Sequence, residues 1–235
     1  MKKIIIYIFI LTGVCAQAQF ATNMFGKDPI VNLENFDKQR VHWGYFLGFN
    51  SYDFKFEYIN TPETDIQVKS VTGFNVGLVG NLRLFEYLDL RFEPGLYYAQ
   101  RDLSYSHSTE ESEYLRPVKS TYIHFPLLLK FSSLRTGNLR PYLLGGYSRS
   151  LNLSSNEQAQ EDNSNEVFRM KRWTNNYELG FGIDFYFEYF KFSPSIRGVF
   201  GLEDELIRDN DPNSPYTGNV GAMRTRAVFI NFTFH

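Results

Sequence analysis

RTRAVFINFTFH, residues 224 to 235, is the stretch that decides the fold of this chain. From residue 228 on, even positions are apolar and odd positions, apart from Phe229, are polar: Val228, Ile230, Phe232 and Phe234 alternate with Asn231, Thr233 and His235. A period of two residues predicts a β-strand with one apolar and one polar face. The sequence ends on this aromatic strand, as barrels of the bacterial outer membrane commonly do, so its apolar face is expected to meet either a core or lipid.

The composition favours lipid. Aromatic residues make up 17% of the 235 residues, with 23 Phe and 16 Tyr beside 17 Gly. Aromatic residues and glycine in alternating strands are typical of a membrane β-barrel, although the mean hydropathy of −0.32 is that of an ordinary soluble protein. No apolar run after the N-terminal leader approaches the roughly 20 residues of a transmembrane helix. The sequence therefore argues against a membrane protein built from transmembrane helices.

The leader has the features of a secretory signal. Two lysines precede an apolar run from residue 4 to about residue 14, and small residues follow up to Ala18. We predict a signal peptide over residues 1–18, cleaved after Ala18. The residues before Cys15 make a poor lipoprotein motif, so lipid attachment there is the less favoured alternative. The mature chain then has no cysteine and no disulfide.

Removal of the leader also changes the charge. Two lysines are lost, which leaves 22 basic against 26 acidic residues and moves the formal charge from −2 to −4. An acidic chain argues against a nucleic-acid partner. Residues 19–40, which include Pro29, show no strand alternation, and we interpret them as a periplasmic N-terminal segment. Residues 41–235 are predicted to form the barrel.

Within residues 41–235, eight segments alternate apolar and polar side chains. They cover about 41–58, 74–84, 88–101, 122–131, 139–151, 176–187, 190–200 and 224–235. In the first, the apolar phase changes after Ser51, which predicts a β-bulge near residues 50–52. Pro126 falls inside the fourth and predicts a second bulge, because proline cannot donate a ladder hydrogen bond. The fold class is thus predicted as all-β, an eight-stranded antiparallel transmembrane barrel.

The connections between these segments alternate between long and short. Outer-membrane barrels have an even strand number, short periplasmic turns and longer outer loops. Both termini are therefore expected in the periplasm, with the loops near residues 60, 110, 160 and 210 outside. Candidates for the interfacial aromatic girdles are Trp43, Tyr58, Tyr87, Trp173 and Tyr189. The alternative, a soluble lipocalin-like barrel, would put the apolar face inside around a ligand.

The polar face of the predicted barrel is strongly charged. In the third segment Asp89, Arg91, Glu93 and Arg101 share one face, an arrangement that would be very unfavourable in a dry core but can pair across strands in a lumen. A candidate salt-bridge network lines the lumen: Asp89, Arg91, Glu93, Arg101, Lys130, Arg140, Glu178, Asp184 and Arg197. Eight strands leave an interior that side chains just fill. We interpret the network as a plug, with a narrow ion path as the alternative.

The search for catalytic chemistry is negative. Ser106, His107 and Ser108 form the only local cluster that suggests a hydrolase, and a solvated surface loop is the simpler interpretation. His42 and His124 are expected to hydrogen-bond in the lumen rather than to bind metal. The acidic loops are interpreted as solvated rather than as cation or partner sites: Glu110, Glu111, Glu113, Glu157, Glu161, Asp162, Glu166, Glu203, Asp204, Glu205, Asp209 and Asp211. No enzyme activity, cofactor or metal is predicted.

Three segments carry a resemblance to a known family. NLENFDKQRVHWGYFLGFNSYDFK, residues 32–55, resembles the opening of the PorT family of Bacteroidetes outer-membrane proteins, in which N-L-x-N-F-D precedes a first strand with H-[FW]-G and L-G-[FL]-N. YIHFPLLLKFSS (122–133) and RPYLLGGYSRSLNL (140–153) are similar to the family's fourth and fifth strands. The family's eight-stranded barrel covers the whole mature chain.

The resemblance implies a component of the type IX secretion system, which exports proteins with a C-terminal signal domain and, in gliding species, adhesins. It does not imply the export channel. One hypothesis is that the opening phrase docks other secretion components through Asn32, Leu33, Asn35, Phe36, Asp37 and Arg40; the other is that it only caps the barrel mouth. A generic structural or adhesive outer-membrane barrel is the second function considered, and an outer-membrane enzyme the third.

Overall fold

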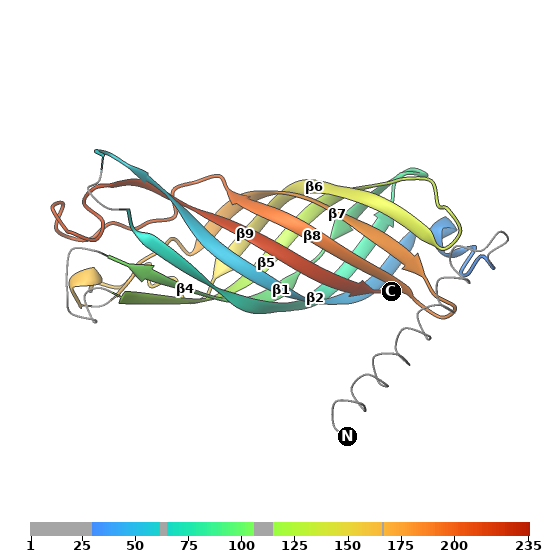
Figure 1. The fold of residues 1–235 in the computed structure, drawn as a ribbon, viewed down its shortest axis with the longest axis horizontal. Coiled ribbons are helices and arrows are strands. Elements are labelled where there is room, and N and C mark those ends of the chain that lie inside the picture. The colour runs from blue at the N-terminus through green and yellow to red at the C-terminus, as the bar shows by residue number, and fades with distance from the viewer. Residues whose placement is uncertain (1–29, 62–64, 106–114, 166) are drawn as a thin grey trace, which may run out of the picture.

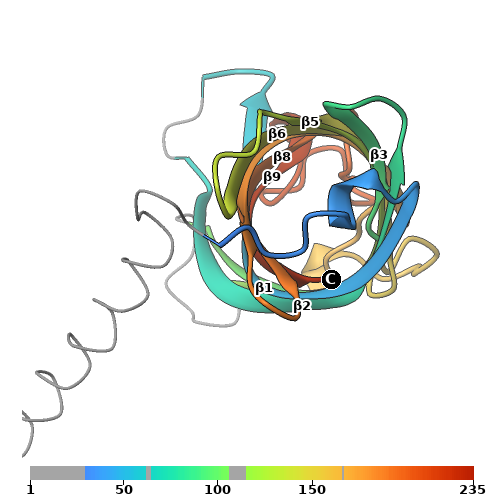
Figure 2. The same ribbon diagram turned by 90° about the vertical axis from the view of Figure 1, so that its right-hand side faces the viewer.

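The alternating segments form one antiparallel sheet that closes into a ring (Figures 1 and 2). A computed structural model describes residues 30–61, 65–105, 115–165 and 167–235. The predicted signal peptide, its cleavage site and the cluster Ser106 to Ser108 lie outside these residues. The strands are β1 (Val41–Tyr58), β2 (Gln67–Arg83), β3 (Leu88–Phe92), β4 (Gly95–Ser104), β5 (Leu115–Ser132), β6 (Leu139–Asn152), β7 (Trp173–Tyr186), β8 (Lys191–Gly201) and β9 (Val220–Phe234).

The sheet has nine strands in eight positions. The predicted third strand is divided at Glu93 and Pro94, because proline has no N–H for the ladder. Both halves, β3 and β4, still lie between β2 and β5. At the division, hydrogen bonds still join the chain to both neighbouring strands. Leu78 N of β2 donates to Pro94 O (3.0 Å), and Glu93 N donates to Pro126 O of β5 (3.4 Å). The predicted all-β antiparallel barrel is confirmed, and the ring closes where β1 pairs with β9.

Large apolar side chains cover the outside of most of the ring. They point outward from every strand position, and examples are Trp43, Leu47, Phe74, Leu127, Leu143, Phe181 and Ile230. This is the orientation of a lipid-facing wall, opposite to the lipocalin-like alternative. We call the part that carries this belt, including residues 41–49 of β1, 74–82 of β2 and 228–234 of β9, the membrane section. Tyr87, Trp173 and Tyr189 are exposed on the outside as predicted.

Farther from the termini the pattern inverts. Tyr52 and Phe54 of β1 are 3% and 2% exposed and point inward, whereas Asp53 and Lys55 point outward. The register with β9 continues unbroken from Tyr45 to Glu57, so the predicted bulge near residues 50–52 is wrong. The phase change reports instead a change of surroundings, from lipid to water. We call this part, residues 52–58, 67–71, 99–105, 115–122 and 220–227, the distal section.

Tyr58 belongs to the inverted pattern, so its predicted place in an aromatic girdle is wrong. It packs against the apolar interior of the distal section. Its hydroxyl accepts a hydrogen bond from Ile66 N at 2.9 Å.

A real irregularity lies in the neighbouring strand. The register of β2 with β4 shifts between Val71 and Phe74. Gly73 is required there, because a Cβ would collide with the carbonyl of Tyr98 and the side chain of Asn50. A bulge bends its strand and can end pairing. Pairing of β1 with β2 indeed stops at Ser51 and Thr72, and beyond that point β1 pairs with β9 and β2 with β4.

The bulge predicted at Pro126 is also wrong. The register of β5 with β6 runs without a shift from Tyr122 to Ser132, with Pro126 opposite Ser148. A proline removes one donor but adds no residue to the strand, so the count on the two strands stays equal.

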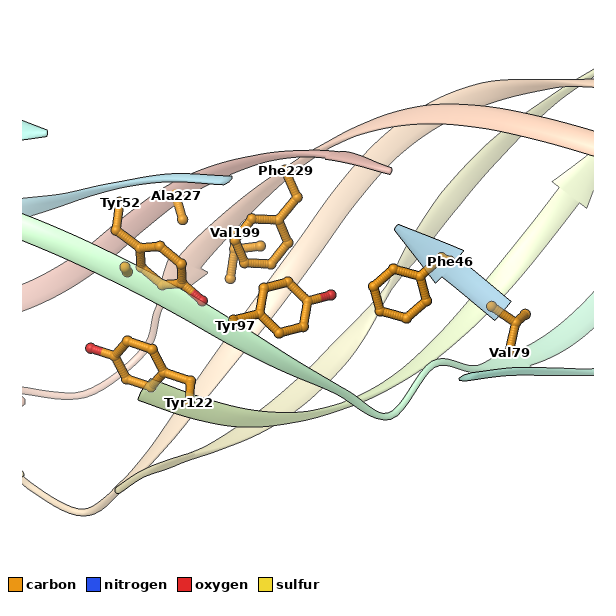
Figure 3. Close-up of a cluster of buried hydrophobic side chains, with 9 residues drawn as sticks. Phe46, Tyr52, Val79, Tyr97, Tyr122, Val199, Ala227 and Phe229 are labelled. Atoms are coloured by element: carbon orange, nitrogen blue, oxygen red, sulfur yellow. The ribbon is translucent and has the colours of Figure 1, made fainter. Parts of the chain in front are cut away.

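The interior is filled along its length. In the middle of the barrel Tyr52, Tyr97, Tyr122 and Phe229 point toward one another from four strands (Figure 3). The distal section holds a second cluster: Phe54, Leu103, Tyr105, Val118, Phe168, Met170, Leu206, Val220 and Met223. Charged residues occupy the interior of the membrane section. Among the described residues, no helix is long and apolar enough to cross a membrane.

Candidate functional site

Four charged side chains form a chain of ion pairs inside the membrane section. Arg91 pairs with Glu93, Glu93 lies 2.8 Å from Arg197, and Arg197 lies 3.4 Å from Glu178. His124 Nε2 lies 2.6 Å from Glu178 Oε1 and its Nδ1 lies 2.7 Å from Ser150 Oγ. All five are 2% exposed or less. Strand alternation places them inward, and cross-strand neighbours supply the opposite charge.

A second group lies nearer the termini. Asp184 lies 2.6 Å from Lys130 Nζ and 3.8 Å from Lys191 Nζ, and it accepts a hydrogen bond of 2.6 Å from Ser193 Oγ. Lys130 Nζ also lies 4.0 Å from the centre of the Tyr142 ring. The Asp184 carboxylate is thus shared between two buried ammonium groups.

The predicted network is only partly assembled. Asp89 accepts a hydrogen bond from Asn81 Nδ2 (3.1 Å), and no ion pair of Asp89 or Arg101 occurs within the described ranges. Arg101 instead donates to Ser120 and Tyr122 and lies 3.9 Å from the Phe54 ring centre. Arg140 pairs with Asp37 of the segment before β1, at the mouth of the ring, rather than with another member of the predicted network.

His124 hydrogen-bonds in the lumen as predicted, and both His124 and Lys191 join these ion pairs, although the predicted network included neither residue. The alternation of the two strands does indicate that both side chains point inward, since each lies on the polar face of its strand.

These ion pairs are buried inside the ring. Removing charges from water is costly, and only close opposite charges with further hydrogen bonds offset that cost. The described side chains at this level have almost no exposed surface. An interior of eight strand positions is just wide enough for side chains to fill, and the interpretation of this network as a plug stays a prediction.

The segment before β1 closes the mouth of the ring at the end where the C-terminus lies (Figure 2). Asn32 N donates to Asn138 Oδ1 (2.9 Å), and Asn32 Nδ2 donates to Tyr186 O (3.1 Å). Arg135 donates to the carbonyls of Asn32 and Leu33. Turns between strands thus hold the segment by its backbone and by one amide side chain.

Phe36 and Asp37 point into the mouth. The Phe36 ring stacks on His42 with centroids 4.4 Å apart, and Lys191 Nζ lies 4.7 Å from the Phe36 ring centre. The Asp37 carboxylate accepts hydrogen bonds of 2.8 Å from the Tyr186 hydroxyl and lies 3.5 Å from Arg140. These contacts are those of a cap.

The six residues of the predicted docking segment therefore divide between two faces. Asn32, Phe36 and Asp37 contact the barrel. Asn35 and Arg40 are exposed, and Leu33 is half-buried with a φ of 49°. A partner at this end of the barrel would meet Glu34, Asn35, Lys38, Gln39 and Arg40.

Two loop acids that were predicted to be solvated are buried instead. Asp162 is buried, and its Oδ2 accepts a hydrogen bond from Asn210 N (3.0 Å). Glu205 is 1% exposed and accepts hydrogen bonds from Thr225 N (3.0 Å) and Thr225 Oγ1 (2.8 Å). Burial raises the pKa of Glu205, although the bonds from Thr225 oppose that shift. These acids organise the distal loops. Glu110, Glu111, Glu113 and Glu166 lie outside the described residues.

Within the described ranges, no three His, Cys, Asp or Glu residues gather closely enough to hold a metal ion. His124 is engaged with Glu178 and Ser150, and His42 with Phe36.

Comparison with known proteins gives one family match. A family model described as "Outer membrane protein beta-barrel domain" matches residues 17–206. Among solved structures, the chain is similar to the outer membrane protein OprG of Pseudomonas aeruginosa, at 11% identity and a TM-score of 0.46, over 83% of this chain and 93% of that one. It is also similar to neisserial surface protein A, at 8% identity and a TM-score of 0.46, over 83% and 98%. No curated protein matches the chain.

Proposed function

This chain belongs to the outer membrane protein beta-barrel domain family, and we propose, from the resemblance of residues 32–55 to PorT proteins, that it acts in the outer membrane as a component of the type IX secretion system. In this role it supports the export of proteins with a C-terminal secretion signal, and of gliding adhesins where these exist. It is neither the export channel nor an enzyme. The filled lumen of the membrane section supports the exclusion of a channel role.

The observation that carries the proposal is the position of residues 32–40 in the barrel mouth, because these residues open the segment that resembles the PorT family. Its residues Asn32, Phe36 and Asp37 are bonded into the mouth, and Phe36 stacks on His42 of the following strand. The motif therefore folds as one unit with the barrel end. Such a unit presents its other face as a surface of fixed shape, formed by Glu34, Asn35, Lys38, Gln39 and Arg40.

In this proposal the mouth at the C-terminus, which the segment before β1 closes, faces the periplasm. Periplasmic secretion components then meet the exposed face of the cap. The capping contacts hold that face in place, and the exposed residues make the contact with the partner.

Secretion in the native host tests the proposal. A strain that lacks this gene is complemented with the intact gene, with Asn35→Ala/Arg40→Ala, or with Lys69→Ala/Lys119→Ala, a control on exposed positions of the distal section. We expect the deletion to retain unprocessed signal-domain cargo in the periplasm. The intact gene and the distal control should restore secretion, and the exposed-face variant should not.

Normal secretion in the deletion strain would contradict the proposal. Restoration by the exposed-face variant would remove the docking role and leave the segment a cap.

One observation favours a second candidate, a structural or adhesive barrel. The distal section extends the strands beyond the belt, and its loops are held by hydrogen bonds such as Asn163 Nδ2 to Asp209 Oδ1 (2.9 Å). Normal secretion with altered envelope or adhesion in the deletion strain would support this candidate.

A further inference from the structure

A basic groove of about 430 Å³ lies beside the cap, on the rim of the mouth. Lys38 and Arg40 come from the cap, and Arg83 comes from the end of β2. Glu86 also lines the groove, so its charged side chains comprise three cations and one carboxylate. Residues distant in the sequence thus bring a net positive charge to one place.

Two hydrogen bonds to backbone carbonyls tie Arg83 to the cap. Arg83 N donates to Arg40 O (2.8 Å), and Arg83 Nη1 donates to Asp37 O (2.7 Å). Asp37 is itself held in the mouth by Tyr186 and Arg140. The Arg83 guanidinium is therefore oriented before any ligand arrives, with donors to spare.

The three cations also lack a protein counter-charge. Lys38 Nζ donates to the neutral Asn35 Oδ1 (2.9 Å), and within the described ranges none of the three forms an ion pair. By contrast, Arg135, Arg140 and Lys191 at the same mouth pair with Asp37 or Asp184. The groove thus offers a net positive charge, with cations that form no ion pair within the described ranges.

Apolar side chains adjoin this charge. Leu84 and Phe85, in the turn between β2 and β3, also line the groove, and Phe85 is 70% exposed. Trp43, on the outer wall of the neighbouring strand, is 75% exposed. The groove therefore lies where the apolar belt ends, at the level of lipid headgroups.

We propose that the groove binds the phosphodiester headgroup of a phospholipid in the adjacent leaflet. Lys38, Arg40 and Arg83 donate to the phosphate oxygens, and Glu86 accepts from an amine or hydroxyl of the headgroup. Charge-assisted hydrogen bonds to phosphate are strong, and basic pockets at membrane edges recognise headgroups in this way. The acyl chains lie against Leu84, Phe85 and the belt.

Native mass spectrometry of the purified barrel in detergent tests the proposal. Four probes are added separately: phosphatidylglycerol, phosphatidylethanolamine, diacylglycerol without phosphate, and glycerol phosphate without acyl chains. We expect retention of the two phospholipids and of neither fragment. In Lys38→Gln/Arg40→Gln the phospholipid affinity should fall about 30-fold, since each such charge contributes about a fivefold factor.

The matched control is Lys69→Gln/Lys119→Gln, which removes the same charge from exposed positions in the distal section. Its affinity should stay at the level of the unchanged barrel, and heat-dependent gel mobility should show that both variants are folded. Equal loss in the control, or equal retention of diacylglycerol, would overturn the proposal. Retention of glycerol phosphate as strong as that of the lipids would make the groove a site for free phosphate esters instead.

Discussion

The membrane section and the distal section consist of the same strands, yet their side chains are arranged in opposite ways. In β1, Leu47 and Phe49 point outward in the membrane section, whereas Asp53 and Lys55 take the outward positions a few residues later. The ladder with β9 does not change between them. Period-two alternation therefore specifies a strand, while the medium outside the wall decides which face is apolar.

The interiors differ for the same reason. In the membrane section lipid already covers the apolar face, so the inside is free to hold Arg91, Glu93, Glu178 and Arg197 as compensated pairs. In the distal section the wall faces water, and the apolar cluster around Phe54 and Leu103 supplies the burial that stabilises the sheet. One section is held together by lipid outside and paired charge inside, the other by an ordinary core.

The largest effect is expected when the charge balance of the membrane section is broken. Arg197→Ala leaves Glu93 and Glu178 buried without their shared partner. The free energy of unfolding should fall by about 3–5 kcal/mol, measured by urea unfolding in lipid vesicles. Lys119→Ala, at an exposed position, serves as the control. A loss as small as that of the control would mean that the pairs are not needed for stability.

The distal core should respond to lost volume. Leu103 is fully buried in the apolar cluster of the distal section. Leu103→Ala should lower the free energy of unfolding by about 3 kcal/mol through lost burial and a residual cavity. The same vesicle assay measures it, with Leu134→Ala at an exposed turn as the comparison. Equal, small effects at both positions would show that the cluster is loosely packed.

A lysine placed on the outer wall distinguishes the two media directly. Phe181→Lys puts a charge into the belt and should cost about 2 kcal/mol, because a lipid-facing lysine is unfavourable near the middle of the bilayer. Gln100→Lys, outward in the distal section, should cost almost nothing. Similar unfolding midpoints for the two variants would contradict the boundary between the sections.

The smallest effect concerns Glu205 in the distal loops. Because burial raises its pKa in the folded protein, its contribution to stability is complete below the unfolded pKa and is lost as pH rises through the folded one. The distal section should thus be slightly more stable near pH 4 than near pH 7. Trp43→Phe leaves Trp173 as the one tryptophan, so fluorescence can follow urea unfolding at the distal end. Adding Glu205→Gln should reduce the pH difference; an unchanged difference would assign it to another group.

Alternation predicted the strands and which residues point inward, because both depend on local geometry. It also placed Arg91, Glu93, Lys130, Glu178, Asp184 and Arg197 in the interior. Their pairing was not predictable, since neighbours across the ring depend on the register of every strand between them. Arg101 illustrates this: it contacts the Phe54 ring and the Tyr122 hydroxyl, and no carboxylate of the described residues lies within ion-pair distance of it.

Two misinterpretations arose because alternation and composition do not report the surroundings of a segment. The phase change after Ser51 was attributed to a bulge because one medium was assumed along the whole strand. The actual bulge, at Val71 to Phe74 of β2, left no comparable signal beyond one glycine. Likewise, Asp162 and Glu205 were taken for solvated loop acids, because composition does not reveal that loops bond to one another.

The pairing of the first and last strands also has a consequence for how the barrel is made. β1 pairs with β9 from Tyr45 to Tyr58, but with its sequence neighbour β2 only from Val41 to Ser51. During synthesis, residues 52–58 of β1 therefore have no partner strand until residues 220–234 are made. Contacts between such distant residues form slowly, because the chain must first close a long loop. Ring closure is therefore the step that removes the open edge of β1 as a site of aggregation.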